Sequence, residues 1–152
     1  FANRGINGIE GSISTAVGYA SATHHLCFVI TGDLSFFYDI NALWNPNYGN
    51  NLRILVLNND GGEIFHALPG LKLQEPAQRF VTAPHQATAR QKAIDYGFEY
   101  LSARNERELS TTIPHFTRPE IGCKPILLEV FTDKESDIRL LKAYYQSIKS
   151  QH

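Results

Sequence analysis

Two polar residues, Asp33 and Asn59, each follow a short apolar run of the chain, and each has glycine nearby. A carboxylate and a carboxamide offer hard oxygen ligands, which suit Mg²⁺ or Ca²⁺ and not Zn²⁺. Gly61 lacks a side chain, so its carbonyl could approach the same cation closely. One carboxylate and two neutral oxygens leave a divalent cation under-neutralised, which favours a phosphorylated ligand that completes the site.

Short apolar runs must position these residues, and three of them are expected to be buried strands: 26–30, 52–57 and 125–131. A fourth run, 98–101, is a weaker strand candidate. Helical patterns lie between the runs, at 11–22, 35–44, 87–96, 105–116 and 134–148. Alternating strands and helices predict an α/β fold: one domain, 1–152, with a three-layer open parallel sheet and helices on both faces.

In such a sheet, successive parallel strands end at one edge, and that edge is where open α/β folds bind ligands. We therefore expect Asp33 and Asn59 to face a common crevice. Ser35 and the amides that open the next helix would face the phosphates of the ligand. Either motif taken alone could be a plain turn, because Asp, Asn and Gly are usual turn residues.

Glycine and proline punctuate the other elements. Gly97 is placed to end helix 87–96, whereas Pro114 is expected to break or kink helix 105–116. The segment 61–84 carries three prolines and little periodicity, which predicts a functional loop.

The composition is ordinary for a globular chain, with 43% hydrophobic and 19% charged residues and a formal net charge of −1. This balance argues against a nucleic-acid or membrane surface built on bulk charge, and the apolar runs are too short to span a bilayer. Cys27 and Cys123 fit two reduced, buried thiols of a cytoplasmic protein. The six histidines show no ligand spacing. Because the chain starts at Phe1 and contains no Met, we expect it to be a piece of a longer protein.

The pattern "GD–S" followed by "NN–GG" after a strand–helix–strand unit resembles the motif of thiamine diphosphate-dependent enzymes. The usual third residue is Gly, and this chain has Leu34 there. With "NRGINGIEGSISTAVGYA", "GDLSFFYDINAL" and "NNDGGEIFHALP", the chain resembles the 2-succinyl-5-enolpyruvyl-6-hydroxy-3-cyclohexene-1-carboxylate synthase family of menaquinone biosynthesis. The resemblance matches the C-terminal, diphosphate-binding domain of those enzymes and is specific over roughly the first 70 residues.

The resemblance implies a role for each residue that matches the family motif. Mg²⁺, which Mn²⁺ could replace, would bind Asp33, Asn59 and the Gly61 carbonyl. Thiamine diphosphate would contact Ile9, Gly32, Asp33, Leu34, Ser35, Asn59, Gly61 and Ile64. The substrate-binding residues would be Arg4, Phe65 and Leu68.

Three of these assignments have a physical reason and a plainer alternative. Arg4 would hold a substrate carboxylate, a bidentate task that suits guanidinium, although it could be a surface charge. Ile9 would be the stiff aliphatic wedge under the cofactor, although it could be a core residue. The hydrophobic wall formed by Ile64, Phe65 and Leu68 could instead be a buried loop anchor.

The resemblance also implies an activity. The full-length enzyme would be a transferase that decarboxylates 2-oxoglutarate and adds the succinyl-semialdehyde carbanion to isochorismate. Its active site would lie between the subunits of a homodimer or homotetramer. The activating glutamate would come from the N-terminal type of domain, so neither Glu10 nor Glu63 is assigned a catalytic role. We expect the isolated fragment to be inactive and to bind cofactor weakly.

Two alternatives stay open. The first is another thiamine diphosphate enzyme of the acetolactate synthase or decarboxylase type, against which Leu34 and the "NRG–NGI" opening argue. The second is a non-catalytic, flavodoxin-like Mg²⁺-binding module, which usually needs a cluster of acids. A nicotinamide-binding domain is disfavoured, because no Gly-x-Gly-x-x-Gly follows a predicted strand.

Overall fold

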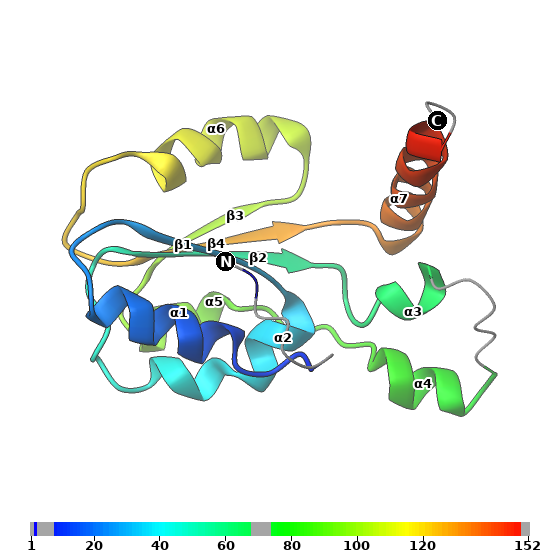
Figure 1. The fold of residues 1–152 in the computed structure, drawn as a ribbon, viewed down its shortest axis with the longest axis horizontal. Coiled ribbons are helices and arrows are strands. Elements are labelled where there is room, and N and C mark those ends of the chain that lie inside the picture. Colours follow the sequence, from blue (N-terminus) through cyan, green and yellow to red (C-terminus); the bar gives the residue numbers. More distant parts are fainter. Residues whose placement is uncertain (1, 3–7, 68–73, 150–152) are drawn as a thin grey trace. The chain divides into compact units, whose positions relative to one another are not determined.

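The computed structural model describes residues 2, 8–67 and 74–149, and the chain divides into two compact units (Figure 1). The first unit comprises Phe1–Asn58 and Thr88–Phe131, and the second comprises Asn59–Ala87 and Thr132–His152. Each unit is described by itself below.

The first unit is built on a four-stranded parallel sheet with the strand order β1-β2-β4-β3. Its strands are β1 (Cys27–Gly32), β2 (Leu52–Asn58), β3 (Glu99–Ala103) and β4 (Ile126–Phe131). The three apolar runs are therefore strands, and the weaker candidate at 98–101 falls in the edge strand β3. Strands β2 and β4 lie in the middle of the sheet, which explains why their sequences are almost continuously apolar.

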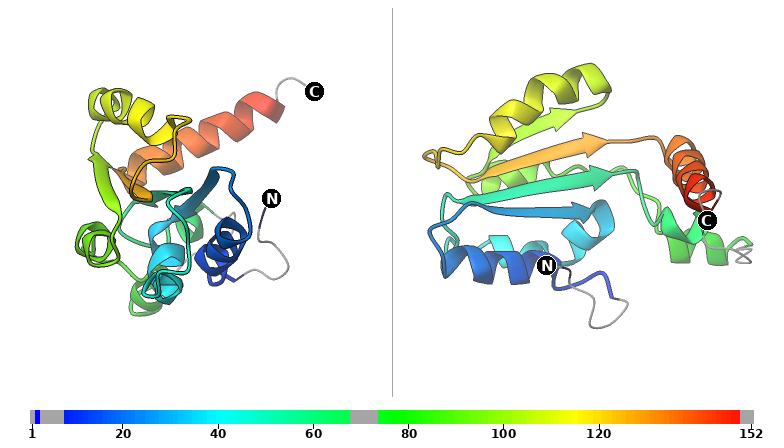
Figure 2. Two further views of the ribbon diagram at one scale, coloured as in Figure 1. Left: turned by 90° about the vertical axis from the view of Figure 1, so that its left-hand side faces the viewer. Right: turned by 45° about the horizontal axis from the view of Figure 1, so that its top comes forward.

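Helices lie on both faces of this sheet, as Figures 1 and 2 show, which confirms the predicted fold class. One face carries α6 (Glu106–Thr117), packed on β3 and β4 over a cluster of Phe116, Ile126 and Leu128. The opposite face carries α1 (Ser12–Ser21), α2 (Asp33–Tyr38) and α5 (Arg90–Asp95).

The larger core lies under α1, α2 and α5. It contains Ile13, Phe36, Leu52, Ile54, Val56, Ala93 and Leu127. Successive side chains of a strand point to opposite faces, so residues 52, 54 and 56 of β2 all contribute to this core. The same alternation places residue 58 on this face, next to the carboxyl edge of the sheet.

Of three local predictions about helix ends and breaks, one is confirmed and two differ from the structure. Gly97 does end α5, with φ of 82° and its N–H bonded to the carbonyl of Ile94 at 3.0 Å. The expected helix 35–44 is divided: α2 ends at Tyr38, and the 3₁₀ helix η1 (Ile40–Leu43) follows. The predicted break at Pro114 is wrong, because α6 continues to Thr117.

The second unit contains the helices α3 (Ile64–Ala67), α4 (Ala77–Thr82) and α7 (Lys134–Lys149), and α3 contacts α7. The segment 61–84 therefore includes two short helices and is less irregular than its prolines suggested. Helix α7 begins where predicted, and the Asp133 carboxylate accepts the Ser136 N–H at 2.9 Å in its first turn. Among the described residues, no helix is both long and apolar enough to cross a bilayer.

Candidate functional site

The ends of β1 and β2 lie side by side at the carboxyl edge of the sheet. The two strands pair in parallel, and their register places Gly32 opposite Leu57. The next residue after Gly32 is Asp33, and the second after Leu57 is Asn59. The expected meeting of these two strand ends is thus confirmed in the first unit. Because Asn59 belongs to the second unit, its binding of one cation together with Asp33 is a proposal.

Asp33 is the first residue of α2 and is buried, with 3% of its surface exposed. Gly32 precedes it in an extended conformation, and the strand passes into the helix without an intervening loop. One Asp33 carboxylate oxygen, Oδ1, accepts the N–H of Leu34 at 2.6 Å. The buried carboxylate is thus fixed at the strand–helix junction, where the motif predicts a metal ligand.

Ser35 and Ile9 are connected, although they are 26 residues apart in the sequence. The Ser35 hydroxyl donates a short hydrogen bond to the carbonyl of Ile9. The Ile9 side chain is 41% exposed, so it is not a residue of the hydrophobic core. This contact brings two of the predicted cofactor residues together within the first unit, and it leaves the Ile9 side chain accessible to a ligand.

In the second unit, Asn59 begins the turn that continues the chain from β2. Its Nδ2 donates a short hydrogen bond to Oε2 of Glu63. The donor end of the amide is therefore held by a carboxylate, and Oδ1 is the Asn59 atom suited to bind a cation. Burial raises the pKa of the Glu63 carboxyl, and the nearby Asp137 carboxylate raises it further, while the Asn59 hydrogen bond opposes this rise.

Gly61 has a backbone that excludes other residues. Its φ is 138°, and a Cβ at this position would lie 2.6 Å from the carbonyl oxygen of Thr82. The adjacent Gly62 donates its N–H to that same oxygen at 2.7 Å, and the N–H of His85 bonds to the carbonyl of Asp60 at 3.3 Å. The turn is thus braced against the segment that follows α4, which fixes the direction of the Gly61 carbonyl.

The donor set fits a hard divalent cation. A carboxylate oxygen, an amide oxygen and a backbone carbonyl oxygen are ligands that Mg²⁺ accepts. The Gly61 carbonyl accepts the N–H of Glu63 at 3.0 Å, and its second lone pair allows a further ligand. Within the described ranges, no group of three or more His, Cys, Asp or Glu side chains is arranged around a metal position.

The predicted wall residues divide between described and undescribed parts of the chain. Ile64 is 62% exposed in α3, so it is not a buried loop anchor. Phe65 is partly buried, and its ring lies 3.0 Å from the position of a Cβ added to Gly62. Arg4 and Leu68 lie outside the described residues.

A buried polar cluster beside this edge was not predicted from the sequence. Glu129 of β4 is fully buried, and Asn58, the last residue of β2, is 1% exposed. Asn58 Nδ2 donates to Glu129 Oε1 at 2.7 Å. The available signal was a charged residue in the middle of the apolar run 125–131, because carboxylates are rarely buried without partners.

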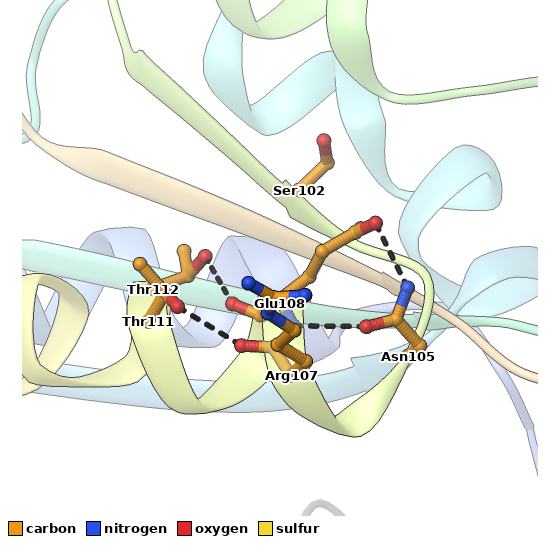
Figure 3. A pocket seen from close by; sticks show the side chains of 6 residues that line it. All are labelled: Ser102, Asn105, Arg107, Glu108, Thr111 and Thr112. Atoms are coloured by element: carbon orange, nitrogen blue, oxygen red, sulfur yellow. Dashed lines mark hydrogen bonds between the residues drawn. The ribbon is translucent and has the colours of Figure 1, made fainter.

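A separate hollow of about 520 Å³ lies at the start of α6, lined by Ser102, Asn105, Arg107, Glu108, Thr111 and Thr112 (Figure 3). Asn105 Oδ1 accepts the N–H of Glu108 at 2.9 Å, and Asn105 Nδ2 donates to the Glu108 carboxylate at 2.8 Å. These bonds form an N-terminal cap for α6. The hydroxyls of Thr111 and Thr112 donate to backbone carbonyls of the same helix, at 3.0 and 2.7 Å. Because most of the polar groups of the hollow serve α6 itself, we assign the hollow no part in the site.

An open, all-parallel α/β sheet with polar residues after two neighbouring strands is consistent with a thiamine diphosphate-binding domain. The chain is 56% identical, over 150 residues or 99% of its length, to the 2-succinyl-5-enolpyruvyl-6-hydroxy-3-cyclohexene-1-carboxylate synthase of Phocaeicola vulgatus. The synthase of the same name from Bacteroides fragilis is 54% identical over 97% of the chain. The one from Bacteroides thetaiotaomicron is 52% identical over 98% of the chain.

This agreement confirms the predicted resemblance: over nearly its whole length, the chain is homologous to part of the 2-succinyl-5-enolpyruvyl-6-hydroxy-3-cyclohexene-1-carboxylate synthases. The chain spans 27% of the length of these three curated relatives. No family model matches the chain.

Proposed function

We propose that the full-length protein is a thiamine diphosphate- and Mg²⁺-dependent synthase of menaquinone biosynthesis. It decarboxylates 2-oxoglutarate and joins the remaining four-carbon unit to isochorismate, giving 2-succinyl-5-enolpyruvyl-6-hydroxy-3-cyclohexene-1-carboxylate. The observation that carries this proposal is the 56% identity to a synthase of that name over 99% of the chain. The acetolactate synthase type and the non-catalytic Mg²⁺-binding module are less well supported by this similarity.

In this proposal, the chain supplies the metal ligands and the diphosphate contacts. Asp33, Asn59 and the Gly61 carbonyl would hold Mg²⁺, and the start of α2 would contact the diphosphate through Gly32, Leu34 and Ser35. When bound, thiamine diphosphate supplies the electron sink that decarboxylation of a 2-oxo acid needs. The chain's own residues would hold the Mg²⁺ whose charge neutralises the diphosphate, and they would fix the position of both groups; these are electrostatic and orienting contributions.

The remaining contacts are apolar or ionic. Ile9 and Ile64 are exposed at 41% and 62%, so both can cover a ligand without rearranging the core. Phe65 and Leu68 would contact substrate, and Arg4 would bind a substrate carboxylate. The full-length enzyme would be cytoplasmic. It would be a homodimer or homotetramer, because the activating glutamate of each site would come from the N-terminal type of domain of a partner subunit. The isolated 152 residues would therefore be inactive.

The test uses the full-length protein after metal and cofactor have been removed by chelation and dialysis. Both substrates, isochorismate and 2-oxoglutarate, are present in every sample. Thiamine diphosphate and Mg²⁺ are then added, each alone and both together, and CO₂ and the succinylated product are quantified. Product that depends on both additions supports the proposal. Acetolactate from pyruvate, with no conversion of isochorismate, would favour the acetolactate synthase type instead.

A further inference from the structure

Glu129 holds together three elements of the first unit at the carboxyl side of the sheet. Its Oε1 accepts Asn58 Nδ2 at 2.7 Å and the backbone N–H of Ala89 at 2.9 Å. Its Oε2 accepts the Tyr100 hydroxyl at 2.7 Å. These donors come from the end of β2, the N-cap position of α5 and strand β3. One carboxylate thus binds donors from three separate parts of the chain.

The register of the sheet explains why one side chain reaches all three donors. Glu129 in the central strand β4 pairs with Val56 of β2 and with Ser102 of β3. Asn58 lies two residues beyond Val56, and Tyr100 lies two residues before Ser102, so both side chains share the face of Glu129. The Ala89 N–H approaches from the start of α5 on that same face.

The groups that form these hydrogen bonds are mostly buried, so their partners are not easily replaced. Glu129 and Ala89 are fully buried, and Asn58 is 1% exposed, so water does not offer substitute partners. A buried carboxylate is costly unless donors surround it, and removing one donor leaves the remaining groups mismatched. Burial and the hydrogen bond to Glu129 raise the pKa of Tyr100, so its hydroxyl stays a donor. The cluster therefore has one stable arrangement of donors and acceptors.

From this geometry we infer that Glu129 is a positioning residue for the metal-binding turn, acting through Asn58. The inference rests on the proposed function, because Asn59 is a proposed Mg²⁺ ligand. Asn58 and Asn59 are joined by a peptide bond, so fixing the Asn58 side chain fixes the point at which the chain leaves the sheet. Groups that orient metal ligands typically change metal affinity by 10–100-fold when removed.

Four variants of the full-length protein separate positioning from general stability. Asn58→Ala removes the donor next to the turn, and Glu129→Ala removes the whole acceptor. Tyr100→Phe is the matched control, because it removes one bond to the same carboxylate at the end away from β2. Glu129→Gln is the conservative variant: its oxygen can still accept from Asn58 and Ala89, while its amide nitrogen donates to the Tyr100 oxygen.

The measurement is the Kd of Mg²⁺ at saturating thiamine diphosphate, together with kcat at saturating Mg²⁺ and the Tm of each variant. We expect Asn58→Ala and Glu129→Ala to raise the Kd by about tenfold or more while kcat changes little. Glu129→Gln should restore the affinity, and Tyr100→Phe should lower the Tm without changing the Kd. If Glu129→Ala does not fold, Asn58→Ala decides the question.

An unchanged Kd in Asn58→Ala, or an equal rise in Tyr100→Phe, would overturn the inference, since the cluster would then act only through stability. Failure of the unaltered protein to bind thiamine diphosphate and Mg²⁺ would instead overturn the proposed function, and this inference with it. The two failures are therefore distinguishable.

Discussion

Asn59 and Glu63 form a short hydrogen bond within one turn, from the amide Nδ2 to the carboxylate Oε2. The bond selects one of the two orientations of the Asn59 amide and so decides which of its atoms is suited to bind a cation. In the proposed metal site, binding by Asn59 would therefore depend on Glu63 as well as on Asn59 itself.

The first prediction concerns Glu63. Glu63→Leu removes the acceptor that orients Asn59, and we expect it to weaken Mg²⁺ binding by about tenfold. Glu63→Gln is the matched control, because its side-chain oxygen can accept the same hydrogen bond. The Mg²⁺ affinity of both full-length variants is measured by titration with Mg²⁺ in the presence of thiamine diphosphate. Equal affinity in the leucine variant and the unaltered protein would show that Glu63 does not orient the ligand.

The second prediction compares two glycines. Gly61→Ala places a Cβ 2.6 Å from the Thr82 oxygen at a φ of 138°, so we expect a destabilisation of about 1–3 kcal/mol. Gly18→Ala is the control: Gly18 lies in α1, and a Cβ there meets nothing within 4 Å. That change should stabilise the helix by roughly 0.5–1 kcal/mol.

Thermal unfolding of both variants beside the unaltered protein, together with limited proteolysis near residue 61, provides the measurement. A Gly61→Ala protein as stable as Gly18→Ala would mean that the turn has a different backbone from the one described.

The third prediction concerns the two thiols. Cys27 is buried, and burial raises the pKa of its thiol, whereas Cys123 is exposed. The thiolate is the reactive form, so at a given pH below its raised pKa Cys27 carries less thiolate than an ordinary cysteine. We expect iodoacetamide at pH 8 to modify Cys123 first, and the reaction of Cys27 to become appreciable only at higher pH.

Peptide mapping by mass spectrometry of the native protein, with a denatured sample as the control, distinguishes the two sites. Equal rates in the native protein would contradict the described burial of Cys27.

The fourth prediction concerns the cap of α6. Asn105→Ala removes the acceptor of the Glu108 N–H, and we expect a loss of about 1 kcal/mol of stability. Asn105→Ser retains a capping oxygen and should recover most of that loss. The comparison is made by chemical unfolding of the two variants. An alanine variant as stable as the serine variant would show that the capping bond contributes little.

The fold was largely predictable because its signals are local. Central strands appear as continuous apolar runs, and Gly97 marks the end of α5 through its positive φ. The break expected at Pro114 does not occur: α6 continues for three more residues, although proline has no N–H to bond to the carbonyl four residues earlier, and nothing in the structure explains this tolerance. The division of helix 35–44 was not predicted, since it accompanies a contact between distant residues: Asp39 accepts the Ser14 N–H at 2.6 Å.

The sequence predicts ligand types for the candidate site, but it does not predict the contacts that support those residues in the structure. The predicted ligands come just after apolar strands: Asp33, Asn59 and Gly61. This position in the sequence is what indicates a site at the edge of the sheet. Glu129 lies inside such a run, and its three donors come from residues 29–71 positions away in the sequence. Contacts of that separation depend on strand order, which single-sequence periodicity does not contain.

Sequence reasoning also placed Cys123 among the buried residues, because it lies beside an apolar run. The structure corrects this: Cys123 is exposed, in the segment between α6 and β4. Closeness to a strand along the chain does not ensure burial, since the loop that enters the strand runs over the surface.

The most direct test of the proposed function is to compare Asp33→Ala with the unaltered full-length protein, with isochorismate and 2-oxoglutarate as substrates. Thiamine diphosphate binding in the presence of Mg²⁺ and formation of the succinylated product are measured in the same samples. We predict that the unaltered protein binds the cofactor and forms product, and that Asp33→Ala loses both while its Tm stays close to that of the unaltered protein without cofactor. Product formation by Asp33→Ala at the rate of the unaltered protein would contradict the account.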